Sequence, residues 1–257
     1  MRAHTTFGAV LAVGVVSASA PGASVTLWPS ADNTLYESST GATSNGAGTG
    51  MFAGRNSQAS NSIRRGLVRF DVAGALPTNA VITGATLRLT NGAANAQPVS
   101  VRLHRTLESW GEAGSVGTQG GGNGGPAQPG DATWIHRFSA STLWSTAGGS
   151  FAAGASASAA VGGPGPYEWT GAGLLADVAL FYAQPLSNFG WTILGDETAS
   201  STAKRFSTRE EADAGLRPAL TIEYSIVPGP GGVWAGLFGA VAAARRRRRG
   251  AGSGVFG

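Results

Sequence analysis

The sequence Ala-Thr-Leu-Arg-Leu-Thr at residues 85–90 decides the fold class. Side chains alternate between the two faces of an extended chain, so Leu87 and Leu89 share one face while Arg88 lies on the other. This alternation predicts a β-strand with one buried and one solvated face, as in antiparallel sheets. Further runs with strand chemistry lie at residues 66–71, 81–82, 99–104, 189–194 and 220–224.

The composition favours the same fold class. The chain has 257 residues, of which 41 are Gly and 12 are Pro, and only 12% are charged. An average soluble domain has about 25% charged residues, so this chain resembles neither a coiled coil nor a helical bundle. The strands follow one another without a βαβ rhythm. We therefore predict an all-β protein, a β-sandwich of jelly-roll type made of two packed sheets.

One segment breaks the strand pattern. Between residues 171 and 184, apolar side chains recur at helical spacing. Thr170 can cap the N-terminus of such a helix, and Pro185 ends it. We expect one short helix packed on the sandwich, with an apolar stripe formed by Leu174, Leu175, Val178, Phe181 and Tyr182.

Two long segments contain almost only small and polar residues. Residues 111–130 are rich in Gly, Ser, Gln, Asn and Pro, and residues 147–165 are rich in Gly, Ala and Ser. Long loops without secondary structure are uncommon in compact domains, and those that occur are usually functional or mobile.

Residues 1–20 have the layout of a secretory signal peptide. Arg2 supplies the positive charge, residues 7–16 form an apolar segment, and Ala18-Ser19-Ala20 is a small-residue cleavage site. Because Pro21 is unfavourable just after a cut, cleavage after Ala18 is an alternative. A short buried N-terminal helix is the structural alternative.

The C-terminal residues 228–257 form a second targeting segment. Pro228-Gly229-Pro230 precedes an apolar stretch at residues 233–244, which is followed by the run Arg245–Arg249. Twelve residues rise only about 18 Å as a helix, against a hydrocarbon core of about 30 Å. The layout resembles the PEP-CTERM sorting tail of exported bacterial proteins, with Gly229 where that family has Glu. The short apolar segment with its basic end predicts a tail helix with transient or weak membrane anchoring. The resemblance implies cleavage by an exosortase-like sorting protease, and a nucleic-acid-binding arginine tail is the alternative.

The body, residues 21–227, contains an ordered series of sequence blocks. They lie at residues 31–36, 52–54, 64–71, 76–77, 85–89, 108–112, 130–134, 144–149, 188–191, 205–210 and 218–220. In their order and spacing, these blocks resemble the DNRLRE domain over most of residues 24–226. That family consists of β-sandwiches related to carbohydrate-binding modules and to disaggregatase-type domains. The resemblance implies an exported, non-catalytic sandwich domain.

Cysteine usage and charge exclude several classes of protein. The chain has no cysteine, which excludes disulfide scaffolds, thiolate metal sites and a cysteine nucleophile. Arg2 and Arg245–Arg249 supply six of the 18 basic residues and none of the 14 acidic ones, which leaves 12 basic residues against 14 acidic ones elsewhere. Nucleic-acid binding needs a basic face on the folded domain, so it has no support here.

Catalytic patterns are sparse. The body has two histidines, His104 in an outward strand phase and His136, and no serine lies in a Gly-x-Ser-x-Gly elbow. A glycosidase needs two carboxylates across a cleft. Glu108 and Glu112 flank Trp110, and Asp131 lies near Trp134, so a glycan-processing enzyme remains an alternative.

The aromatic residues are the strongest indication of a ligand. An indole ring buries a large flat area while its N–H bonds a polar group, which suits a sugar face. Trp110, Trp134 and Trp144 border the two long loops, with Glu112 and Arg137 nearby in sequence. These five residues are our candidate polysaccharide site, and core packing is the alternative role for each tryptophan.

Two charged regions offer other chemistry. Residues 204–217 mix Lys204, Arg205 and Arg209 with acidic residues, which indicates either paired surface charges or an arginine site for an acidic polysaccharide. The oxygen-rich pairs Asp32-Asn33 and Asp196-Glu197 are candidates for a structural calcium site, although no EF-hand spacing is present.

The sequence as a whole predicts an exported, non-catalytic bacterial protein. We expect it to bind polysaccharide or to contribute to the extracellular matrix or cell surface, without a catalytic cofactor. A purely structural surface protein without a small ligand is the other alternative.

Overall fold

The structure of the chain, a computed structural model, describes residues 22–92 and 95–227. The expected signal peptide at residues 1–20 and the expected tail at residues 228–257, with the terminal helices predicted there, lie outside the described residues.

The described chain is mostly β-structure. Its first half contains β1 (Ala23–Leu27), β2 (Ala31–Tyr36), β3 (Thr43–Ser44), β4 (Gly50–Arg55), β5 (Ile63–Arg69), α1 (Val72–Ala75), β6 (Ala80–Asn91), β7 (Val99–Arg105), the 3-10 helix η1 (Gln119–Gly121) and β8 (Gly125–Pro126). Its second half contains β9 (His136–Phe138), β10 (Thr142–Leu143), β11 (Ala157–Val161), β12 (Gly165–Trp169), α2 (Ala172–Ala183), η2 (Pro185–Ser187), β13 (Trp191–Leu194), β14 (Lys204–Ser207), η3 (Ala214–Leu216) and β15 (Ala219–Ile226).

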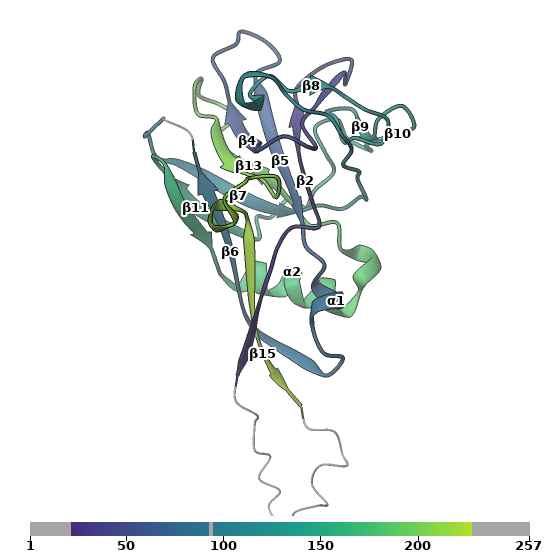
Figure 1. The fold of residues 1–257 in the computed structure, drawn as a ribbon, viewed down its shortest axis with the longest axis vertical. Helices are drawn as coiled ribbons and strands as arrows, with labels where there is room; N and C mark the ends of the chain where they lie inside the picture. Colours follow the sequence, from purple (N-terminus) through teal and green to yellow (C-terminus); the bar gives the residue numbers. More distant parts are fainter. Residues whose placement is uncertain (1–21, 93–94, 228–257) are drawn as a thin grey trace, which may run out of the picture.

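Most strands belong to one large antiparallel sheet. Nine strands follow the order β1-β15-β6-β14-β4-β5-β13-β7-β11, while β12 also pairs with β6 and β2 with β5. Strand β4 pairs with β14 through one part of its length and with β5 through another, so it joins the two halves of the sheet. Figure 1 shows the two helices α1 and α2 lying together on one side of the molecule.

The main core lies between the two halves of this sheet. Leu87 and Leu89 of β6 are fully buried, whereas Arg88 between them is only partly buried, which confirms the predicted alternation. They pack with apolar residues of β5, β7, β13 and β15 into one cluster. The all-β class, the antiparallel pairing and the single longer helix are therefore confirmed.

The predicted helix is α2, with a different start. Leu174, Val178 and Phe181 are fully buried, as the helical stripe predicts. The N-cap position is Gly171, with a φ of 125° and no side-chain cap, so the expected cap by Thr170 is wrong. A glycine adopts this backbone conformation without the steric cost of a Cβ.

A buried carboxylate fastens α2 to the sheet. Asp177 Oδ2 accepts a hydrogen bond from Trp191 Nε1 at 2.9 Å and another from Ser156 Oγ. Its other oxygen lies 3.1 Å from Arg105 Nε. The helix thus presents one acidic residue on its buried face, which the apolar pattern does not reveal.

Two local expectations are wrong. Residues 147–165 are not a structureless loop, since β11 pairs along its whole length with β7 and β12 begins at Gly165. The Ala-Ser composition of β11 has little strand character, and its state is decided by the partner strand. His104 is not outward but only 6% exposed, because Phe151 packs against its ring and the carbonyl of Ala152 lies 2.8 Å from Nδ1.

The two ends of the domain lie together. Ala23 of β1 is paired with Tyr224 of β15. In Figure 1 the short strands β8, β9 and β10 lie at the opposite end of the molecule. The first and last strands of the domain therefore lie at one end of the molecule, and the short strands β8, β9 and β10 with their connecting loops lie at the other.

We expect Asp177→Ala to destabilise the domain by about 2–4 kcal/mol, because it leaves the buried Trp191 N–H and the Arg105 guanidinium without their acceptor. Urea unfolding measures this change. The exposed Glu168 of β12 supplies the control, and Glu168→Ala should change the free energy of unfolding by less than about 0.5 kcal/mol. Equal effects of the two substitutions would contradict the proposed role of Asp177.

Candidate functional site

The three loop tryptophans come together in a second, smaller core. Trp110 and Trp144 are 2% and 5% exposed and belong to one apolar cluster, against which the partly buried Trp134 packs. The indole N–H of Trp110 donates to the carbonyl of Phe189 at 2.8 Å, and that of Trp144 donates to the carbonyl of Thr133 at 2.9 Å. Both N–H groups are thus already bonded within the protein.

Arginines of β5 cover two of these rings. The Arg69 guanidinium carbon lies 5.3 Å from the Trp110 ring centre, and that of Arg65 lies 4.8 Å from the Trp134 ring centre. Arg65 also forms a two-pronged ion pair with Glu197, with N–O distances of 2.7 and 2.9 Å. Cation–π contacts of this kind use the ring faces that a sugar would need.

Trp110 and Trp144 are thus buried, and their surroundings match core packing, the alternative role given for each tryptophan. A sugar can stack only on a ring with an exposed face. Of the three predicted indoles, Trp134 retains partial exposure. Sequence position beside a long loop did not distinguish these roles, because the loops fold back over the rings.

The other two predicted site residues lie in different surroundings. Arg137 Nη1 donates to Ser109 Oγ at 2.7 Å and is partly buried. Glu112 instead makes an ion pair with Arg209, at 2.9 Å between Nη2 and Oε2. The five predicted residues thus divide between the small core, a loop contact and an acidic cluster.

Residues 111–130 are held firmly by buried polar groups. Asn45 Oδ1 accepts the N–H of Gly117 at 2.6 Å, and the hydroxyl of Tyr36 donates to the carbonyl of Gly121 at 2.5 Å. The ends of the segment also touch, because a Cβ on Gly111 would lie 2.0 Å from the Gly130 carbonyl oxygen. The Gly content here permits close backbone approach, and buried side chains position the loop.

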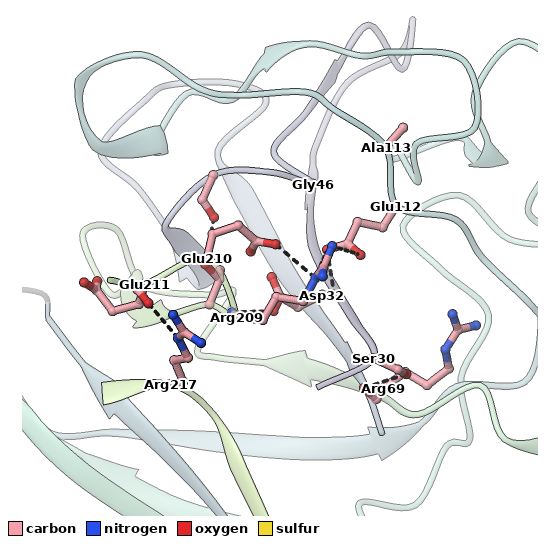
Figure 2. A network of polar contacts seen from close by, with 12 residues as sticks. Ser30, Asp32, Gly46, Arg69, Glu112, Ala113, Arg209, Glu210, Glu211 and Arg217 are labelled. Atoms are coloured by element: carbon pink, nitrogen blue, oxygen red, sulfur yellow. Dashed lines mark hydrogen bonds and ion pairs between the residues drawn. The ribbon is translucent and has the colours of Figure 1, made fainter. Parts of the chain in front are cut away.

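The acidic cluster forms where three distant segments meet. Asp32 lies on β2, Glu112 lies in the Gly-rich segment, and Arg209 with Glu210 follows β14. Ligand oxygens of the three carboxylates lie within 4.8 Å of one another. Figure 2 shows these side chains converging around Arg209.

Hydrogen bonds and charges define this cluster. The Arg209 N–H donates to Asp32 Oδ2 at 2.9 Å, and the Asp32 N–H donates to Glu112 Oε1 at 3.2 Å. Arg209 Nε lies 2.9 Å from Glu210 Oε1. The guanidinium of Arg209 thus bridges both glutamates, as its fork of donors allows.

Burial controls the protonation of these groups. Burial raises the pKa of Asp32 well above its usual range, and the negative charge of Glu210 raises it further. Burial also raises the pKa of Glu112, although its hydrogen bond from Arg209 acts in the opposite direction. Bringing acids together away from water disfavours their charged forms, so this cluster favours a compensating positive charge.

The second expected calcium loop has its carboxylates engaged elsewhere. Asp196 Oδ1 accepts hydrogen bonds from the N–H and the hydroxyl of Thr198, at 2.8 and 2.6 Å. Glu197 pairs with Arg65, as described above. Of the expected pair Asp32-Asn33, Asp32 alone contributes to the acidic cluster, because the Asn33 side-chain oxygen accepts hydrogen bonds from Thr34 and Ser44.

Sequence reasoning missed an exposed tryptophan. Trp28 is 51% exposed and follows β1. It borders a shallow groove of about 330 Å³, lined by Thr26, Leu27, Trp28, Asp71, Gly74 and Ala75. The available signal was Pro29, which lacks an N–H and so disfavours continued strand pairing just after Trp28.

Comparisons with known proteins add no family assignment. No family model matches this chain, and no curated protein matches its sequence. Within residues 22–92 and 95–227, no helix is long and apolar enough to cross a membrane.

The burial of the tryptophans generates a direct stability test. We expect Trp110→Ala to lower the free energy of unfolding by about 3–5 kcal/mol, because it empties the small core. Trp28→Ala should change it by less than about 1 kcal/mol, because the ring is half exposed. Chemical denaturation measures both values. A Trp110→Ala protein as stable as the parent would contradict the core role.

Proposed function

We propose that this chain is an exported, non-catalytic bacterial protein whose sandwich domain binds polysaccharide at the cell surface or in the extracellular matrix. The observation that carries this proposal is the half-exposed indole of Trp28 beside its shallow groove. An exposed indole buries a large flat area when a sugar ring stacks on it, and its N–H remains available for a hydroxyl.

The surroundings of Trp28 suit a sugar. Thr26 and Asp71 line the same groove and provide a hydroxyl and a carboxylate for sugar hydroxyl groups. Asp71 Oδ1 already accepts the N–H of Gly74 at 3.1 Å, which holds the carboxylate in place at the start of α1. A groove of about 330 Å³ falls within the size range of ligand sites, roughly 300–1,000 Å³.

The family resemblance belongs to the same proposal. We assign the domain to the jelly-roll type of sandwich and to the DNRLRE family on the blocks quoted above. Several of these blocks meet in space, since those that contain Asp32, Glu112 and Arg209 contribute to one cluster. Because these residues contact one another within the domain, the blocks support the proposed fold more strongly than they support a particular ligand.

Export and sorting complete the proposal. The expected signal cleavage near residue 20 and the expected tail beginning at Pro228 both fall outside the paired strands β1 and β15. Removal of both segments would therefore leave the Ala23–Tyr224 pairing unchanged. An exosortase-like protease is the partner proposed for the tail, which holds the protein at the membrane only transiently.

Binding is tested with a glycan array followed by calorimetric titration of the best ligand. We expect Trp28→Ala to weaken binding about tenfold, because the ring contributes about 1 kcal/mol beyond area burial, while the melting temperature changes little. Leu186, which is 93% exposed on η2, provides the control, and Leu186→Ala should bind like the parent. Absence of any glycan ligand, or full binding by Trp28→Ala, would favour the purely structural role.

Processing is tested by mass spectrometry of the protein exported from its native host. We expect a mature form near residues 21–227, because both terminal segments are targeting signals. A secreted product that retains Met1 and the arginine run at residues 245–249 would overturn this part of the proposal.

A further inference from the structure

A carboxylate oxygen of Asp32 is buried without a hydrogen-bond partner in the part of the chain that the structure describes. The residue is 0% exposed, and its other carboxylate oxygen accepts the N–H of Arg209 at 2.9 Å. Buried polar atoms almost always have a partner, and a buried charge without one is costly. The free oxygen of Asp32 therefore calls for a ligand of its own.

The residue that carries the free oxygen belongs to a group of three acidic side chains. Oxygens of Asp32, Glu112 and Glu210 all lie within 4.8 Å of one another. Glu210 Oε2 is likewise buried and has no hydrogen-bond partner among the described residues. In Figure 2, Glu112 and Glu210 approach Asp32 and Arg209 from different directions. Two unpartnered oxygens thus belong to one small cluster.

The charges of the cluster do not balance by themselves. Arg209 is the cation in contact with the two glutamates, and its side chain is 43% exposed, so the guanidinium lies toward the outer side. When all three carboxylates are ionised, one guanidinium beside them leaves two negative charges. Arg69 acts on Glu112 only through longer-range attraction. A divalent cation would neutralise the remaining charge.

We propose that Asp32, Glu112 and Glu210 bind a calcium ion that joins β2 to the segment following β14. All three ligands are carboxylates, which are hard oxygen donors that favour calcium or magnesium over zinc or copper. Calcium takes about six to eight oxygen ligands in flexible geometry, so irregularly placed carboxylates and water suit it better than magnesium. The site is separate from the groove at Trp28, so either proposal can fail without the other.

The test uses the full chain after treatment with EDTA and removal of the chelator. We expect about 10 mM calcium to raise the melting temperature by about 5–10 °C, as a site with a dissociation constant near 10⁻⁴ M would. The same concentration of magnesium should have a smaller effect. Isothermal titration with calcium chloride should give one site per chain.

Variants distinguish this site from adventitious binding. Asp32→Asn retains an oxygen for the Arg209 N–H but loses one negative charge, so it should remain folded in EDTA and lose the calcium response. Glu210→Gln should also lose it, and this variant decides the matter if Asp32→Asn does not fold. Asp196→Asn, in the other acidic loop, should respond like the parent.

Three results would overturn the calcium site. The first is an unchanged parent melting temperature in calcium, which would mean that protons rather than a cation neutralise the cluster. The second is an equal calcium response in the parent and in Glu210→Gln. The third is loss of the response in Asp196→Asn alone, which would place the ion in the other loop.

Discussion

The side-chain amide of Asn33 links the sheet to the loops that cover it. Its oxygen accepts hydrogen bonds from the Thr34 N–H at 2.7 Å, the Ser44 hydroxyl at 2.9 Å and the Asn45 N–H at 3.1 Å. Asn45 then accepts the N–H of Gly117 at 2.6 Å. Because a buried amide oxygen must keep its donors, this chain of contacts fixes the Gly-rich segment relative to β2.

Strand β5 serves two cores at once. Val68 of β5 and Phe70, which directly follows the strand, belong to the main core, whereas Leu67 belongs to the smaller core of the loop tryptophans. On the same side as Leu67, the guanidinium groups of Arg65 and Arg69 cover indole rings. A planar guanidinium stacks on an aromatic face, so these arginines close the small core and leave little ring area for a ligand. The loop layer is consequently part of the folded unit.

The acidic cluster joins segments that are remote in sequence. Asp32 and Glu112 are 80 residues apart, and Asp32 and Arg209 are 177 residues apart. A cation bound there would hold β2, the Gly-rich segment and the end of β14 together. The proposed calcium site would thus stabilise the loop-bearing end of the domain, whereas the groove at Trp28 lies beside β1 and α1. One region of the domain would then bind the stabilising cation, and a different region would bind the sugar.

The sequence alone determined the strands around Leu87 and the helix around Val178, because a repeating apolar pattern requires only that one face be buried. Only the tertiary structure decided which tryptophans are exposed, since apart from Pro29 beside Trp28 no local pattern separates a core ring from a surface ring. It likewise decided that the Ala-Ser segment β11 is a strand, because the pairing partner is β7. The exposure of the tryptophans and the strand state of β11 depend on contacts between distant segments, which the spacing of residues along the chain does not reveal.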